Sequence, residues 1–90
     1  MEKIKMSTQD KVVAFILLVT DSVATQQIFH DVKKMDKVKE AHMIYGDYDL
    51  IIKVELNNLQ EMTAFMMQLR KDFAVKKSST LITLSEGNSS

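Results

Sequence analysis

The chain has 90 residues, with 12 basic and 12 acidic side chains, no cysteine, no proline and 46% hydrophobic residues. This length allows one domain, and the lack of cysteine excludes disulfide scaffolds, cysteine-based metal sites and thiol nucleophiles. The formal net charge is zero, so the chain lacks the surplus of basic residues that autonomous nucleic-acid binding requires.

The two ends are polar, and the domain is expected between them. Residues 1–10 and 86–90 are predicted to be polar tails around a domain at 11–85. The longest apolar run, residues 12–19, is far shorter than the roughly twenty residues of a membrane span. Because residues 1–10 also lack an apolar core of signal-peptide length, a cytoplasmic protein is expected.

The first predicted elements are a strand and a helix. Residues 12–19 (VVAFILLV) are β-branched and aromatic, which predicts a strand, and Thr20-Asp21-Ser22 suits a helix cap. A helix is then expected over residues 23–35, with its apolar side chains spaced three to five apart. These side chains are Val23, Ile28, Phe29, Val32 and Met35.

Two strands, a helix and a final strand are expected to follow. Residues 38–45 and 49–55 predict strands joined by a two-residue hairpin at Gly46-Asp47. Asn58 is typical of a helix cap, with Glu61 three residues later, and the helix is expected over 59–73. Residues 76–84 predict the last strand.

The order β-α-β-β-α-β predicts a ferredoxin-like α+β fold. Two split βαβ units give a four-stranded antiparallel sheet in spatial order 4-1-3-2, with both helices on one face. This order places the apolar runs 12–19 and 49–55 at the centre and the more polar strands at the edges.

The opposite face of this sheet is expected to be apolar and uncovered. Along the first strand Val13, Phe15, Leu17 and Val19 alternate with other apolar residues, so both faces of the strand are apolar. A second copy that packs sheet to sheet about a two-fold axis would cover this face. The sequence therefore predicts a dimeric α/β barrel.

No catalytic or metal-binding motif is present. The two histidines, His30 and His42, lie twelve residues apart without a recognisable ligand spacing, so packing or surface roles are expected for both. No catalytic triad pattern or glycine-rich phosphate loop occurs. The methionines of the second helix, Met62, Met66 and Met67, are interpreted as core residues. The sequence predicts no enzyme, metal or cofactor.

One polar cluster stands out, formed by Tyr45-Gly46-Asp47-Tyr48-Asp49 at the hairpin with Ser78 and Thr80 on the last strand. A tight turn and ordinary edge-strand residues explain it without any ligand. However, the topology places the hairpin and the start of the last strand at the same end of the sheet, about 10 Å apart. A small ligand that touches both would fit best where subunits meet.

Residues 14–84 resemble the effector (RAM) domain of the Lrp/AsnC transcription regulators. The resemblance rests on VKEAHMIYGDYDLIIKVE, with its G-x-Y-D turn, and on the closing strand SSTLITL. It implies sheet-to-sheet dimers that form a ring, an octamer or decamer, with free amino acids bound between dimers. Carried over by position, it implies ligand contacts at Gly46, Asp47, Tyr48, Asp49, Ser78 and Thr80. Backbone N–H groups of the turn would hold the carboxylate, and an aspartate and a hydroxyl would hold the ammonium.

Full-length regulators of this family carry an N-terminal helix-turn-helix, whereas ten polar residues precede the first strand here. A stand-alone effector module that senses an amino acid, does not bind DNA and co-assembles with full-length regulators is therefore expected. Two alternatives stay open. One is a small dimeric α/β-barrel enzyme, such as a cofactor-independent monooxygenase or a muconolactone isomerase-like protein, and the other is a purely structural assembly module.

Overall fold

The computed structural model describes residues 11–83 and shows four strands and two helices. Their order is β1 (Val12–Thr20), α2 (Thr25–Val32), β2 (Val38–Met43), β3 (Leu50–Leu56), α3 (Leu59–Asp72) and β4 (Val75–Ile82). The tails predicted at 1–10 and 86–90 lie outside the described residues. No helix within residues 11–83 is long and apolar enough to cross a membrane.

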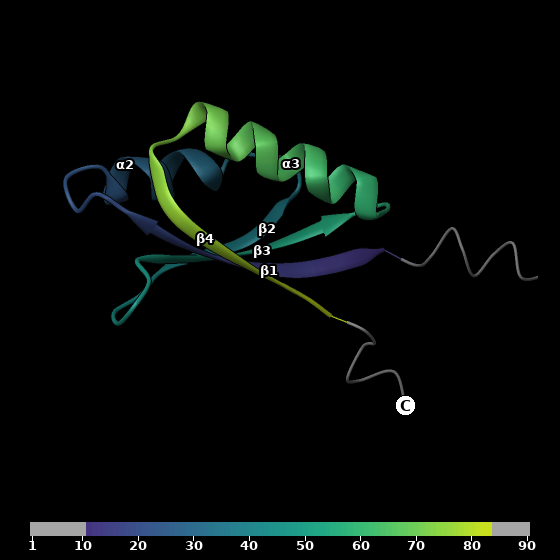
Figure 1. Ribbon diagram of the computed structural model, residues 1–90, viewed down its shortest axis with the longest axis horizontal. Helices are drawn as coiled ribbons and strands as arrows, with labels where there is room; N and C mark the ends of the chain where they lie inside the picture. The colour runs from purple at the N-terminus through teal and green to yellow at the C-terminus, as the bar shows by residue number, and fades with distance from the viewer. Residues whose placement is uncertain (1–10, 84–90) are drawn as a thin grey trace, which may run out of the picture.

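The strands form one antiparallel sheet in the order β2-β3-β1-β4, which confirms the predicted topology. The two apolar strands, β1 and β3, are central and pair in register, with Ile16 opposite Ile52. Both helices lie on the same side of the sheet (Figure 1). The chain therefore has the βαββαβ ferredoxin-like fold.

The core lies between the helices and one face of the sheet. Alternate residues of β1 and β3 face it, because successive strand side chains point to opposite faces. The buried strand residues are Ala14, Ile16, Leu18, Leu50, Ile52, Val54 and Leu56. Five helical side chains complete the core: Ile28, Val32, Met62, Phe65 and Leu69.

Helix α3 begins at the predicted cap. The Asn58 side-chain oxygen accepts from the Glu61 N–H at 2.9 Å, while the Glu61 carboxylate accepts from the Asn57 N–H at 2.9 Å. The carboxylate thus reaches one residue further back than in a standard capping box. Hydrogen bonds from the Asn57 backbone and side chain lower the pKa of Glu61 below its ordinary value of 4.5, and Lys37 adds to this effect.

The lowered pKa of Glu61 predicts a small pH dependence of stability. A carboxyl with a lower pKa in the folded state contributes stability above its unfolded-state pKa, and this contribution is lost as the pH falls through the folded-state pKa. In the parent chain the urea midpoint should fall as the pH drops from about 5 to about 3. In Glu61→Gln the midpoint should change less over this pH range. An equal acid slope in both proteins, from parallel urea titrations, would contradict the role of this carboxylate.

Helix α2 is shorter than predicted, and its cap differs. Thr20 is buried as the last residue of β1, and its hydroxyl lies 2.6 Å from the Thr25 hydroxyl. Residues 22–24 form a turn, and Val23, expected to face the core, is 90% exposed. The prediction of a cap at residues 20–22 is wrong, because Thr20 pairs with Val75 of β4 and its N–H donates to the Asp49 carboxylate, which keeps it in β1. The Asp21 carbonyl accepts from Ala24 and Thr25 instead.

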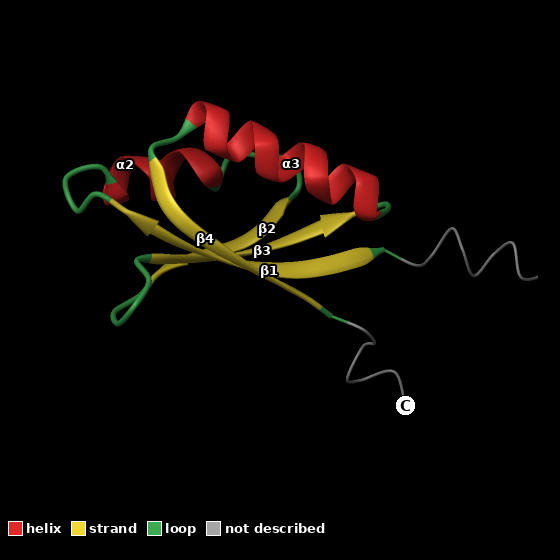
Figure 2. Ribbon diagram, in the orientation of Figure 1, coloured by secondary structure: helices red, strands yellow, loops and turns green. Residues whose placement is uncertain are grey.

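The β2–β3 connection is longer than the two-residue hairpin predicted. The strands end at Met43 and begin again at Leu50, and Ile44 N–H donates to the Asp49 carbonyl at 2.9 Å. Residues 45–48 therefore form a four-residue loop inside that bond. Gly46 has a backbone φ of 121°, a conformation that residues other than glycine rarely adopt. Figure 2 shows the loop projecting from the sheet on the side away from the helices.

Candidate functional site

The side of the sheet without helices, called here the open face, presents an apolar stripe along β1. Its centre consists of Val13, Phe15, Leu17 and Val19 from β1 and Ile51 from β3. These side chains are only half-buried, by one another and by neighbouring strands. No element of residues 11–83 covers them (Figure 1). The predicted apolar, uncovered face is thus present.

Charged residues of β2 and of the central strand β3 lie on the open face beside its apolar centre, with Lys53 opposite Phe15 and Glu55 opposite Val13. Glu40 pairs with Lys53 and His42 pairs with Ile51, so their side chains lie on this face. The Glu40 carboxylate lies 3.4 Å from His42 Nε2 and 3.8 Å from Lys53 Nζ. His42 is exposed here, and no group of three metal-ligating side chains exists among residues 11–83. These contacts describe a polar region beside the apolar stripe.

The tip of the 45–48 loop is exposed. Tyr45, Gly46 and Asp47 all lie in solvent, and the Tyr45 side chain is among the most exposed of the described chain. Exposed aromatic side chains beside a Gly turn are available for contact with another molecule. Nothing from the same subunit covers this tip among the described residues.

The base of the loop is tied to the sheet by two side-chain contacts and by a backbone hydrogen bond from Asp49 N–H to the Leu18 carbonyl at 2.8 Å. The Lys77 ammonium of β4 lies 5.7 Å from the centre of the Tyr48 ring. The Asp49 carboxylate accepts from the backbone N–H of Thr20 at 2.8 Å. Asp49, predicted to hold a ligand, therefore already has a structural partner at the end of β1.

Ser78 and Thr80 face the helix side of the sheet. They pair with Leu18 and Ile16, which are core residues, and so point away from the open face. Arg70 of α3 donates to the Ser78 hydroxyl at 2.7 Å, and the Thr80 hydroxyl lies 3.8 Å from the Met66 sulfur. Within one subunit the hairpin and these hydroxyls do not converge, consistent with their predicted separation.

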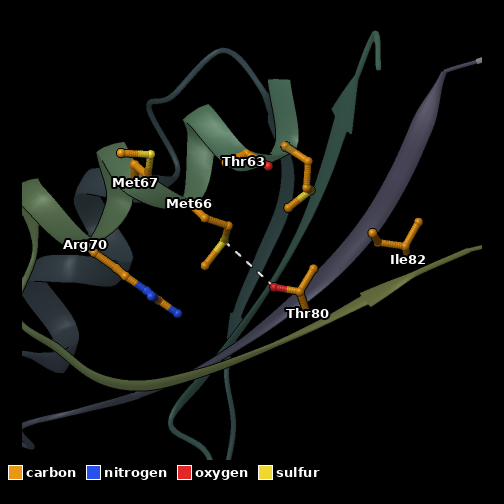
Figure 3. A pocket seen from close by; sticks show the side chains of 7 residues that line it. Thr63, Met66, Met67, Arg70, Thr80 and Ile82 are labelled. Carbon is orange, nitrogen blue, oxygen red and sulfur yellow. Dashed lines mark hydrogen bonds between the residues drawn. The ribbon is translucent and has the colours of Figure 1, made fainter. Parts of the chain in front are cut away.

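Arg70 and the methionines around it are functional candidates that the sequence reading missed. Met62, Met66 and Arg70 recur every four residues and so share one face of α3. They line a pocket of about 380 Å³ between α3 and β4 (Figure 3). Reading the methionines as core filler was wrong for Met67, which is 67% exposed. The sequence signal that could have identified this pocket is the four-residue spacing of Met62, Met66 and Arg70 along α3.

Comparison with known families identifies the group to which this domain belongs. The family model described as "Lrp/AsnC ligand binding domain" matches residues 13–89, most of the chain. The chain belongs to the Lrp/AsnC ligand-binding domain family. This is a regulatory ligand-binding family rather than an enzyme family, and its domains bind amino-acid effectors and oligomerise.

Solved structures agree with the Lrp/AsnC assignment. Hypothetical protein PHS023 from Pyrococcus horikoshii is 38% identical, with a TM-score of 0.77, and the match covers 84% of this chain and 93% of that one. FFRP-DM1 is also 38% identical, with a TM-score of 0.77 and coverage of 81% and 99%. Escherichia coli AsnC, at 18% identity and a TM-score of 0.80, shares the fold over 97% of this chain and 58% of its own. No curated protein matches this chain.

Proposed function

We propose that this chain is an amino-acid-sensing assembly module, which dimerises through the open face and modulates Lrp/AsnC regulators by co-assembly. The open face is the observation that carries this proposal. Its central apolar residues lie on two neighbouring strands and have no cover within the described chain. A chain of this size is marginal as a monomer, so covering this surface contributes directly to stability.

A second copy is the partner that fits the open face best. Two twisted sheets pack face to face at about 10 Å, and a two-fold axis brings like residues of the two copies together. Glu40 and Lys53 on the open face carry opposite charges. In a two-fold dimer, Glu40 of one copy can therefore approach Lys53 of the other. The result is the dimeric α/β barrel expected from the sequence.

The effector would bind where a loop of one subunit approaches β4 of another. Gly46, Asp47 and Tyr48 project from the sheet, whereas Ser78 and Thr80 lie on its helix side, so one subunit cannot present both to a small ligand. A neighbouring dimer in a ring would supply the second half. The turn N–H groups would then hold the carboxylate, and Asp47 or Asp49 would hold the ammonium.

Co-assembly with full-length regulators would follow from a shared interface. If full-length relatives with this fold carry a similar apolar sheet face, a mixed dimer would bury a similar surface. The zero net charge of this chain does not favour DNA contacts of its own. Effector binding would modulate the regulator only if the ligand prefers one assembly state over another.

A thermal-shift screen against the twenty amino acids tests the sensor function. At ten times its Kd a ligand stabilises the folded state by about 1.4 kcal/mol, or roughly 5–10 °C for a domain of this size. We expect one or a few amino acids to give such a shift at millimolar concentration. In Asp49→Asn the shift should shrink, because the remaining amide oxygen can still accept from Thr20 but carries no charge for an ammonium.

Light scattering provides the control for this screen. An intact oligomer that shows no shift with any amino acid would overturn the homomeric sensor, and an unchanged affinity in Asp49→Asn would remove that carboxylate from the site. A small enzyme would instead convert a substrate to a product and would show no selective thermal shift with amino acids. A purely structural module is distinguished by assembly that no small molecule affects.

A further inference from the structure

A groove runs between α3 and the exposed edge of β4, on the helix side of the sheet; we call it the α3–β4 groove. One end is the apolar pocket of about 380 Å³ lined mainly by Met62, Met66, Met67 and Ile82. The other end is a second pocket of about 380 Å³ lined by Arg70, Lys76 and Ser78, and also by Lys77, whose ammonium lies over the Tyr48 ring. Arg70 lines both pockets and so marks their junction. Both volumes are in the range of small-molecule sites.

The polar groups at this junction are hydrogen-bond donors with capacity left for a ligand. A guanidinium has five N–H groups, and Arg70 uses one to donate to Ser78 at 2.7 Å. The Thr80 hydroxyl donates to the Met66 sulfur at 3.8 Å, a weak acceptor that a ligand oxygen would readily replace. Figure 3 shows Arg70 extending from α3 toward β4, with Met66, Thr80 and Ile82 around the same space.

The charge of the α3–β4 groove favours an anion. Arg70 and Lys76 are the cations at its polar end, and among residues 11–83 neither pocket is lined by Asp or Glu. A carboxylate placed there would form a charge-assisted, bidentate contact with Arg70. An ammonium on the adjacent carbon would instead face the Arg70 guanidinium with Lys76 nearby, and like charges at such range repel.

We propose that the α3–β4 groove binds an aliphatic 2-oxo acid. The carboxylate would lie on Arg70, the 2-oxo oxygen would accept from Thr80 or Ser78, and the aliphatic chain would contact Met62, Met66 and Ile82. The inference rests on the proposed effector function and adds a second ligand class, the deaminated counterpart of an aliphatic amino acid. Because the groove lies on the helix side, the sheet-to-sheet dimer contact does not cover it, but it shares Ser78 and Thr80 with the proposed effector site, so the two ligands would compete there.

Calorimetric titration of the full chain in its assembled state tests the proposal with three probes. These are 4-methyl-2-oxopentanoate, 4-methylpentanoate, which lacks the oxo group, and leucine. We expect 4-methyl-2-oxopentanoate to bind about three- to tenfold more tightly than 4-methylpentanoate, the effect of one hydrogen bond. In Arg70→Gln, binding of the oxo acid should weaken at least about tenfold.

Two further variants separate a specific site from general charge attraction. Thr80→Val should weaken the oxo acid about three- to tenfold while leaving 4-methylpentanoate unchanged, because only the oxo acid has the acceptor. Lys71→Gln removes an exposed cation next to Arg70 that lines neither pocket, and it should change affinity less than about twofold.

Three results would overturn the proposal: no binding of the oxo acid, binding that Arg70→Gln does not affect, or leucine binding that Arg70→Gln weakens as strongly. The amino-acid sensor fails separately, on the twenty-amino-acid screen and Asp49→Asn. Leucine binding that is unaffected by Arg70→Gln but lost in Asp49→Asn would support the sensor, and oxo-acid binding that Arg70→Gln weakens in the same protein would support the groove.

Discussion

Substitution Leu17→Lys is expected to convert the assembled protein to monomers. Leu17 lies at the centre of the open face, opposite Ile51 on β3 and Ser79 on β4. A lysine there would place an unpaired ammonium between the two sheets of the dimer, which costs several kcal/mol. At 1.4 kcal/mol for each tenfold, dimer dissociation should become at least about 100-fold easier.

The matched control is Leu59→Lys. Leu59 is the first residue of α3, on the helix side, and 58% exposed, so the same chemical change there should leave the assembly intact. Light scattering during size-exclusion chromatography gives the mass of each variant. A Leu17→Lys protein with the parent mass would show that the open face is not the dimer interface.

Substitution Leu69→Ala should destabilise the fold more than any exposed change. The Leu69 side chain is fully buried under α3 against the sheet core. Removing it loses the transfer free energy of the buried atoms and leaves a cavity, so the free energy of unfolding should fall by about 2–5 kcal/mol. Because a domain of this size has a total stability of only about 5–10 kcal/mol, much of the protein would unfold near physiological temperature.

Leu59→Ala is the control for this loss, since it makes the same truncation in the same helix at an exposed position. Its free energy of unfolding should change by less than about 0.5 kcal/mol. Urea unfolding followed by circular dichroism, at equal protein concentration, measures both variants. Equal losses would show that helix propensity rather than core packing accounts for the effect.

The topology was predictable because the four strands differ clearly in hydrophobicity. The unbroken apolar run of residues 12–19 requires a central strand, and residues 38–43, with Lys39, Glu40 and His42, suit an edge. Helix α3 was predicted to within one residue, since Asn58 caps it and its apolar side chains recur at helical spacing.

Local detail was harder to predict where tertiary contacts compete with short-range preference. Threonine is a common helix-capping residue. The Thr20 N–H, however, donates to the carboxylate of Asp49, 29 positions away, and Thr20 stays in β1. Val23 fits a helical apolar pattern, but the β1–α2 turn leaves it in solvent. Neither long-range bonds nor turn geometry follows from residue types alone.

The candidate site was predicted only in part for the same reason. The residue types at the hairpin and on β4 predicted a ligand site, which stays a prediction, and the structure places Ser78 and Thr80 on the helix side of the sheet. The side of the sheet to which Ser78 and Thr80 point depends on the β1–β4 register, which shifts at Thr20. Arg70 joins this group through folding alone, because it lies eight residues before Ser78 in a different element.

The contact between Tyr48 and Lys77 has a consequence for how the two proposed interfaces communicate. It joins the loop that would meet a neighbouring dimer to the strand that borders the sheet-to-sheet contact. A ligand that displaces the loop must either break this contact or pull β4 with it. If it does so, the ligand changes dimer affinity, and by thermodynamic reciprocity dimerisation changes ligand affinity by the same factor. Substitution Tyr48→Leu would then weaken the coupling between the two interfaces, while Asp49 still ties the loop to Thr20.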